Sequence, residues 1–200
     1  MKKLKLIILL GIMVLTNLCC FGADEQTKKS AEIQEVKERL KAVYSTNNLE
    51  DAYRIVSSIP ENERDSEIWY MLANITQDLN EEEDSIFYLQ KAILTDSKND
   101  KAYYNLGNLY LNKGQVYKSI KMYKEAIKLK SDFAPYHYNL GCALLKAKDI
   151  KGAKSEFSKA VTLKPNEPNY RYNLALAYKK LGNDKKAQKE LDEYNKLTQG

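Results

Sequence analysis

Glycine and proline are scarce in this chain, with 8 Gly and 4 Pro among 200 residues. Few residues are therefore available to break helices or to build tight turns. The chain contains 15 Tyr, and 44% of its residues are hydrophobic while 30% are charged, which is the composition of a folded protein with much wetted surface rather than of a disordered one. The sequence predicts an all-α fold with aromatic packing.

Cysteine and histidine are also rare, at three and one residues. Two of the cysteines lie near the start, so Cys142 is the only thiol in the rest of the chain and no disulfide framework is expected there. The single histidine, His137, falls where a packing residue is expected. The sequence has no Gly-rich phosphate loop, no nucleophile elbow and no paired His/Cys spacing, so we expect no cofactor, no metal site and no enzyme.

The first residues lack acidic side chains and contain a short uncharged run. Lys2, Lys3 and Lys5 precede the apolar stretch from Leu6 to Leu15, a pattern typical of a secretory signal peptide. Extended to Phe21, the run would be about 24 Å long as a helix, against about 30 Å of membrane hydrocarbon. We therefore assign residues 1–18 to a signal peptide.

The run ends in Leu15-Thr16-Asn17-Leu18-Cys19-Cys20, which resembles the processing site of bacterial lipoproteins. The resemblance implies lipidation of Cys19, or alternatively of Cys20, with residues 19–31 forming a lipid anchor and polar tether to a membrane of the bacterial cell envelope. The site departs from the family pattern because Leu15 lies four residues before Cys19 and bulky Leu18 directly precedes it. The alternative is cleavage near Gly22 or Ala23, which would give a soluble periplasmic or secreted protein.

A repeat of 34 residues runs through the rest of the chain. Its first half recurs without a gap as Trp69-Tyr70-Met71-Leu72-Ala73, Tyr103-Tyr104-Asn105-Leu106-Gly107, His137-Tyr138-Asn139-Leu140-Gly141 and Arg171-Tyr172-Asn173-Leu174-Ala175. Its second half recurs as Ser85, Leu89, Ala92; Ser119, Tyr123, Ala126; Ala153, Phe157, Ala160; and Ala187, Leu191, Tyr194. Apolar residues recur at helical spacing in both halves, so each unit is predicted to be two amphipathic helices.

This pattern is similar to that of the tetratricopeptide-repeat (TPR) family. The resemblance implies a right-handed helical solenoid of stacked antiparallel helix pairs, with units at 66–99, 100–133, 134–167 and 168–200. A degenerate first unit is expected at 32–65, where Val36, Leu40 and Val56 fit the apolar positions. The chain departs from the family pattern in having Thr76 and Leu144 at a usual Tyr position, and only Pro165 at the usual Pro.

In the TPR family the first helix of each pair lines a concave surface. The resemblance places a column of Tyr and Asn side chains there, which is similar to the asparagine ladder of the O-GlcNAc transferase repeats. An Asn amide offers two donors and an acceptor, which suits the main chain of an extended peptide, although Tyr-Asn-Leu-Gly could also recur for reasons of fold alone. The predicted partner-binding residues are Tyr70, Asn74, Tyr104, Asn105, Asn108, Tyr138, Asn139, Tyr172 and Asn173.

Charge is divided unequally along the chain. Residues 24–100 hold 18 Asp+Glu and 9 Lys+Arg, whereas residues 101–200 hold 9 and 20, giving net charges of −9 and +11. Two functions remain open: a membrane-tethered adaptor or assembly factor that binds a protein or peptide partner, and a self-associating envelope protein that joins its acidic half to the basic half of another copy. Nucleic acid is not expected as a partner of an exported protein.

Overall fold

A computed structural model describes residues 25–199, which are helical with no strand among them. The chain forms two compact units that divide between Arg64 and Asp65. The predicted signal peptide and both candidate lipidation sites, Cys19 and Cys20, lie outside the described residues. No helix within the described range is both long and apolar enough to cross a membrane.

The first unit contains a helix over residues 25–45, α2 (Leu49–Ser57) and the short 3-10 helix η1 (Glu61–Glu63). Leu40, Val56 and Ile59 are buried in this unit, which overlaps the degenerate repeat predicted at 32–65. Residues 25–31, which belong to the predicted tether, form the first turns of the long helix and are exposed. Their polar composition is that of an exposed helix start.

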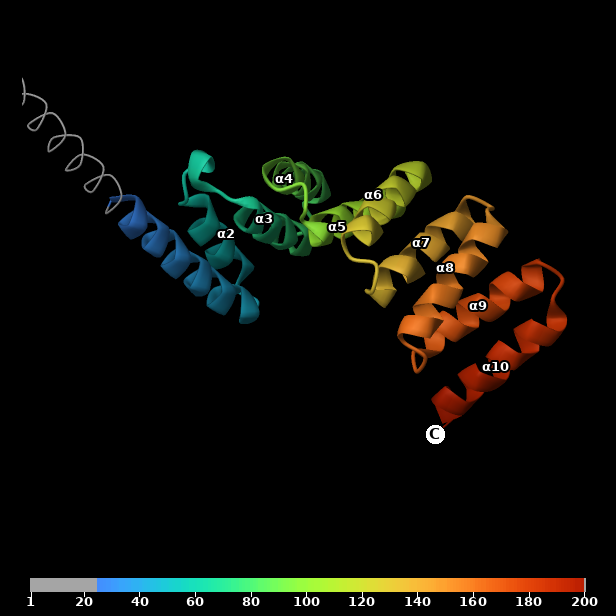
Figure 1. Cartoon of the computed structure of the whole chain (residues 1–200). Helices are drawn as coiled ribbons and strands as arrows, with labels where there is room; N and C mark the ends of the chain where they lie inside the picture. The colour runs from blue at the N-terminus through green and yellow to red at the C-terminus, as the bar shows by residue number, and fades with distance from the viewer. Residues whose placement is uncertain (1–24, 200) are drawn as a thin grey trace, which may run out of the picture. The chain divides into compact units, whose positions relative to one another are not determined.

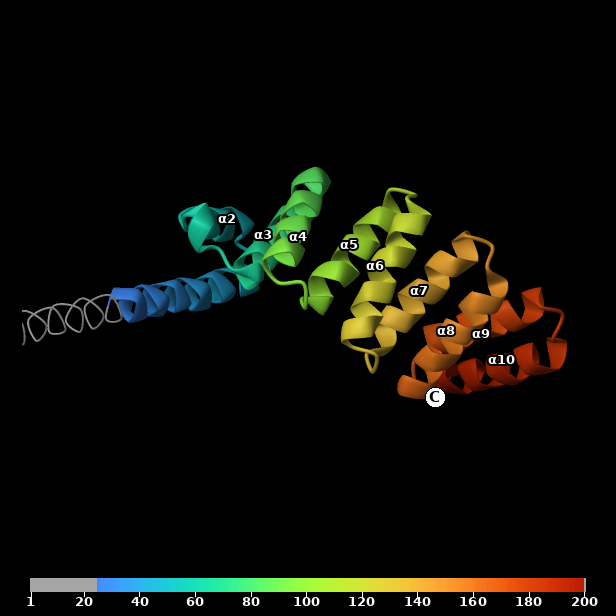
Figure 2. The same cartoon turned by 45° about the horizontal axis from the view of Figure 1, so that its top comes forward.

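The second unit consists of four helix pairs in chain order (Figures 1 and 2). Figure 2 shows the pairs following one another from the green helices to the red ones, each pair lying beside the next. The pairs are α3 (Ser66–Asp78) with α4 (Glu82–Thr95), α5 (Asp100–Asn112) with α6 (Val116–Leu129), α7 (Ala134–Lys146) with α8 (Ile150–Leu163), and α9 (Pro168–Lys180) with α10 (Asp184–Gln199).

Local signals in the sequence set the helix starts. The side chains of Asp65, Asn99 and Asp149 cap α3, α5 and α8 by accepting a hydrogen bond from the backbone N–H three residues on, which satisfies donors that have no partner in the helix. Pro135 and Pro168 lie in the first turns of α7 and α9, where the missing proline N–H costs nothing.

The core is shared between pairs rather than enclosed within them. One buried cluster joins Tyr123 of α6, Leu140 of α7, Phe157 of α8 and Leu174 of α9. Helices of 13 or 14 residues are marginally stable alone in water. Stacking therefore supplies the apolar contacts that keep each pair folded, as expected for a solenoid.

Candidate functional site

The nine residues predicted to bind a partner lie on the first helices of the four pairs, and we call them the Tyr–Asn column. Its tyrosines come from α3, α5, α7 and α9. Tyr70, Tyr104 and Tyr138 are half-buried, and Tyr172 is 49% exposed. The column is thus neither sealed inside the core nor fully in solvent.

Hydrogen bonds join the column from one repeat to the next. Asn105 Nδ2 donates to Tyr70 Oη at 3.2 Å, Asn139 Nδ2 donates to Tyr104 Oη at 2.9 Å, and Asn173 Nδ2 donates to Tyr138 Oη at 3.0 Å. We call Asn105, Asn139 and Asn173 the rung asparagines. The same bond therefore recurs across three successive interfaces between pairs.

Each rung asparagine also uses its second amide hydrogen. Asn105 donates to Asn74 Oδ1 and Asn139 donates to Asn108 Oδ1, both at 2.9 Å. In the third repeat Cys142 occupies the position of Asn74 and Asn108, and Asn173 instead donates to the backbone carbonyl of Asn169 at 2.9 Å. Both amide hydrogens of every rung asparagine are therefore donated to groups within the protein.

The backbone carbonyl of Asn169 fixes the orientation of the Asn173 side-chain amide, because a carbonyl oxygen can only accept a hydrogen bond. Asn173 must therefore point its nitrogen toward Asn169 and Tyr138. The tyrosine and asparagine partners of Asn105 and Asn139 can both donate and accept, so they do not fix an amide orientation in this way. The Oδ1 atoms of the three rung asparagines have no partner within residues 25–199, and none of them is a fully buried, unsatisfied atom. At each of these interfaces one amide oxygen thus has no protein partner and is not fully buried.

This geometry changes the chemistry expected from the sequence. We expected the column amides to offer two donors and an acceptor, but both amide hydrogens of each rung asparagine are donated within the protein. The donors instead couple neighbouring helix pairs, so these asparagines serve the fold as well as any partner.

Two tyrosines that the sequence analysis did not select support the column from the next repeat. The ring of Tyr136 packs against Tyr104 with centroids 4.8 Å apart, and Tyr170 stacks on Tyr138 at 4.7 Å. Both are buried, and their spacing of 34 residues was a signal that could have identified them. Buried Tyr123 adds a bond from its hydroxyl to Asn108 Oδ1 at 2.8 Å.

Burial keeps the column side chains neutral. It raises the pKa of the Tyr104 hydroxyl, and burial with the neighbouring Cys142 raises the pKa of Tyr138 to about 12. Burial also raises the pKa of the Cys142 thiol, and a protonated thiol is a poor nucleophile. The column therefore offers hydrogen bonds and ring faces at physiological pH, and no reactive anion.

Positive charge lies at the ends of the same helices. Lys146 occupies the last turn of α7, and Lys179 and Lys180 occupy the last turn of α9. All three are exposed and form no ion pair within the described part of the chain. Lys146 also acts electrostatically on the Cys142 thiol, which places its charge near the column.

His137 is a packing residue, as the sequence indicated. It is 3% exposed, its Nδ1 lies 2.7 Å from Glu156 Oε2, and its Nε2 lies 2.9 Å from the Ser131 carbonyl oxygen. The carboxylate and the carbonyl both accept, so both bonds form together only when each ring nitrogen carries a proton, as in the imidazolium form. The bond to Glu156 raises the pKa of His137 despite burial.

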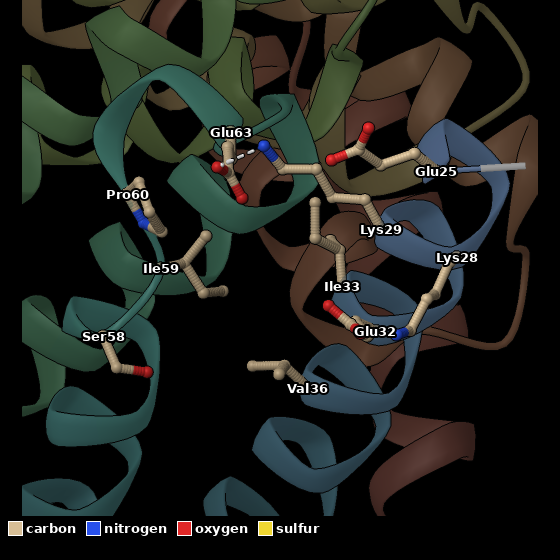
Figure 3. Close-up of a pocket in the computed structure, with 10 residues that line it drawn as sticks. All are labelled: Glu25, Lys28, Lys29, Glu32, Ile33, Val36, Ser58, Ile59, Pro60 and Glu63. Carbon is tan, nitrogen blue, oxygen red and sulfur yellow. Dashed lines mark ion pairs between the residues drawn. The ribbon is translucent and has the colours of Figure 1, made fainter. Parts of the chain in front are cut away.

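No group of three or more His, Cys, Asp or Glu that could hold a metal occurs in the described residues. The first unit has a crevice of about 500 Å³ between the helix over residues 25–45 and the segment 58–63. Figure 3 shows Lys29 extending to Glu63, with Nζ 2.7 Å from Oε1, above Ile33, Val36 and Ile59. This ion pair joins the two parts of the unit.

Comparison with known proteins identifies the repeat. Models described as "Tetratricopeptide repeat" match residues 66–99, 88–121 and 144–200, and one described as "TPR repeat" matches residues 107–148. A sequence comparison with curated proteins gives no significant match. Together the models span residues 66–200, the same part of the chain in which the 34-residue period was found.

Solved structures show the same fold at low sequence identity. A crystal structure of MamA aligns with a TM-score of 0.74 at 20% identity, covering 80% of this chain and 94% of that one. MamA from Desulfovibrio magneticus RS-1 gives 0.75 at 18% identity, covering 83% and 94%. YrrB, described as a TPR protein with an unusual peptide-binding site, gives 0.67 at 19% identity, covering 79% and 82%. With its period, its stacked helix pairs and these matches, the chain belongs to the tetratricopeptide-repeat family.

Proposed function

We propose that this protein is a non-catalytic interaction module that holds an extended segment of a partner protein against the Tyr–Asn column. The observation that carries the proposal is the row of accessible tyrosine rings on four successive first helices, with a rung asparagine beside the tyrosine on the last three. Tyrosine gives broad apolar contact at low entropic cost, and its hydroxyl orients a guest. YrrB, which has the same fold, is described as having a peptide-binding site.

The proposed setting is the bacterial cell envelope, where a lipid on Cys19 tethers the repeats to a membrane as an adaptor or assembly factor. The support is the basic start, the uncharged run and the Cys19-Cys20 pair that ends it. Several acyl chains would hold the protein firmly, because each buried methylene contributes about 0.8 kcal/mol.

Site-specific crosslinking tests the interaction module. A photoreactive phenylalanine analogue introduced at Tyr104, Tyr138 or Tyr172 is expected to capture the same partner from cells, identified by mass spectrometry. Tyr117 is the matched control, because it is a tyrosine of the second helix α6 and is 80% exposed. Capture of the same species at Tyr117 as at the column, or at Tyr117 alone, would contradict binding at the column.

Mass analysis of the mature N-terminus tests the anchor. The expected species begins at Cys19 with diacylglyceryl and N-acyl groups, and Cys19→Ser is expected to remain unprocessed and unlipidated. A mature chain that begins near Gly22 or Ala23 without lipid would show that the protein is released in soluble form.

Self-association is a second candidate function, favoured by the net charges of −9 in residues 24–100 and +11 in residues 101–200. Opposite charges on two halves steer like copies into head-to-tail contacts at low salt.

A further inference from the structure

The second unit contains an open hollow that shares no residue with the Tyr–Asn column, and we call it the α8 hollow. Its volume is about 550 Å³, which lies within the range of small-molecule sites, about 300–1,000 Å³. Six of its nine lining residues belong to α8, and the others are Ile127 of α6, Ser131 and His137. The hollow is therefore formed mainly by second helices, whereas the column lies on the first helices.

The hollow exists because three side chains of α8 are small. Ser155, Ser158 and Thr162 line it, and the 34-residue period identifies the equivalent residues of the other pairs. These are Phe87, Gln90 and Leu94 in α4; Lys121, Lys124 and Lys128 in α6; and Lys189, Asp192 and Lys196 in α10. Each of them is larger than its counterpart in α8. The third pair thus departs from its own repeat at the surface where the hollow lies.

A half-buried lysine is part of the same departure. Lys154 lines the hollow and forms no ion pair within the described residues. The two preceding repeats have Ile86 and Ile120 at this position. Removing a cation from water costs free energy that an isoleucine does not cost. The repeat fold therefore does not require Lys154, and an anion in the hollow would offset its cost.

The charges around the hollow favour such an anion. None of the nine residues that line it is Asp or Glu. The neighbouring Glu156 has its Oε2 atom 2.7 Å from His137 Nδ1 and its Oε1 atom 2.8 Å from Lys159 Nζ. One carboxylate is thus shared by two cationic side chains, which leaves Lys154 without a counter-ion.

The remaining lining groups define the rest of a ligand. The Ser155 hydroxyl forms no hydrogen bond within residues 25–199, so it is free to donate. Ser158 Oγ and Thr162 Oγ1 instead donate to backbone carbonyls of α8, both at 2.9 Å. Ile127 and Leu163 add apolar surface, and Leu163 is 38% exposed. One free cation and one free hydroxyl beside apolar side chains suit a single negative charge on an apolar chain.

We propose that the α8 hollow binds a small organic carboxylate that carries a short apolar chain. Lys154 Nζ and Ser155 Oγ donate to the two carboxylate oxygens, and the chain lies against Ile127 and Leu163. Hydrogen bonds between charged partners are roughly twice as strong as those between neutral ones. Each methylene that the hollow buries fully adds about fourfold in affinity.

Titration followed by NMR tests the site on the 15N-labelled full chain in micelles of an uncharged detergent. Hexanoate is the probe. Hexanol and hexylamine keep its chain and replace the head group, acetate keeps the head group and shortens the chain, and hexyl phosphate carries a larger negative charge. The backbone amide signals of Ser155 and Ser158 report binding, and their shifts against concentration give the dissociation constant.

Three variants locate the bound probe. Lys154→Ile restores the residue of the two preceding repeats, and Ser158→Gln places the residue of α4 in the hollow without changing the charge. Lys151→Ile is the matched control, because Lys151 is an exposed lysine of α8 that does not line the hollow. The comparison of probes on the wild type needs no variant to fold.

We expect hexanoate to bind saturably, and acetate, hexanol and hexylamine to bind at least about tenfold more weakly. Lys154→Ile and Ser158→Gln should each weaken hexanoate about tenfold, and Lys151→Ile less than about twofold. No saturable shift with hexanoate, hexanol binding as tightly as hexanoate, or equal losses in Lys154→Ile and Lys151→Ile would overturn the site. Tighter binding of hexyl phosphate than of hexanoate would overturn the assignment of a carboxylate.

Discussion

At the residue scale, the contact between the two helices of each pair is set by matched sizes. The first helix contributes Ala73, Gly107, Gly141 or Ala175, and the second contributes Leu89, Tyr123, Phe157 or Leu191 at the equivalent position. Glycine occurs opposite an aromatic ring and alanine occurs opposite leucine. A Cβ on Gly107 would lie 2.7 Å from Tyr123 Cε1, and one on Gly141 would lie 2.6 Å from Phe157 Cε1.

This matching predicts the effect of Gly141→Ala. The added methyl group must displace the fully buried Phe157 ring, so the free energy of unfolding is expected to fall by about 1–3 kcal/mol. In the Phe157→Leu background the same substitution should be much less costly, because the pair then resembles Ala73 with Leu89. Urea unfolding of the double-mutant cycle measures the coupling, and additive losses would contradict the size-matching explanation.

His137 predicts a pH dependence of stability. The bond to Glu156 raises the pKa of His137 in the folded protein. The stability that protonated His137 contributes is therefore fully present below the unfolded pKa of about 6.5, and it is lost as the pH rises through the folded pKa. Burial alone would raise the pKa of Glu156, but the hydrogen bonds from His137 and Lys159 lower it below its usual value. The stability that Glu156 contributes is therefore lost as the pH falls through its folded pKa.

His137→Arg provides the control for this prediction. Arg171, the equivalent residue of the next repeat, donates to Glu190 Oε2 and to the Pro165 carbonyl, both at 2.9 Å, and arginine does not titrate in this range. The free energy of unfolding of the wild type should fall between pH 6 and pH 9, and that of His137→Arg should fall less. Equal slopes for the two proteins would show that His137 is not responsible.

At the scale of the elements, each helix pair is closed by one residue with left-handed backbone. These residues are spaced by 34: Asn80, Gly114, Lys148 and Gly182, with φ of 64°, 71°, 63° and 73°. Glycine adopts this conformation freely and asparagine tolerates it, whereas a lysine pays a steric cost. Lys148 is thus the one strained member of the set.

We therefore expect Lys148→Gly to stabilise the protein. Relief of the left-handed strain exceeds the extra entropy that glycine gains in the unfolded chain, and the net increase in the free energy of unfolding should be about 0.5–1 kcal/mol. Thermal unfolding measures the change. Lys151→Gly is the control, because it places glycine within α8 and should lower the melting temperature; a lower value for Lys148→Gly as well would contradict the strain.

The helix pairs could be predicted from sequence because their signals are local and repeated. The period of 34 residues and the apolar spacing predicted the pairs α3/α4 to α9/α10. The hydrogen bonds of the column could not be predicted in the same way. Whether Asn173 offers donors to a guest depends on Asn169 and Tyr138, which it meets only after one turn of helix and one repeat are in place.

At the scale of the whole molecule, the rung asparagines link neighbouring helix pairs, and we expect these links to make the repeats unfold together. Asn139 links α7 to Tyr104 and Asn108 of α5. Asn139→Ala removes both bonds, so the free energy of unfolding is expected to fall by about 1–3 kcal/mol. If the repeats on either side then begin to unfold separately, the slope of the unfolding free energy against denaturant concentration should also fall. Asn195→Ala, at an exposed position of α10, should change neither quantity; an unchanged slope in Asn139→Ala would mean that apolar stacking alone couples the repeats.

The charge division predicts how copies of the chain meet each other. Residues 24–100 carry a net charge of −9 and residues 101–200 carry +11, and such opposed fields act over about 10 Å at 0.1 M salt but only about 3 Å at 1 M. If the two halves dock, light scattering should show a mass that grows with concentration at low salt and returns to the monomer at high salt. Lys179→Glu with Lys180→Glu should weaken that growth, because both cations are exposed and form no ion pair within the described residues. A mass that stays monomeric at every salt concentration would remove self-association and leave the Tyr–Asn column as the functional surface.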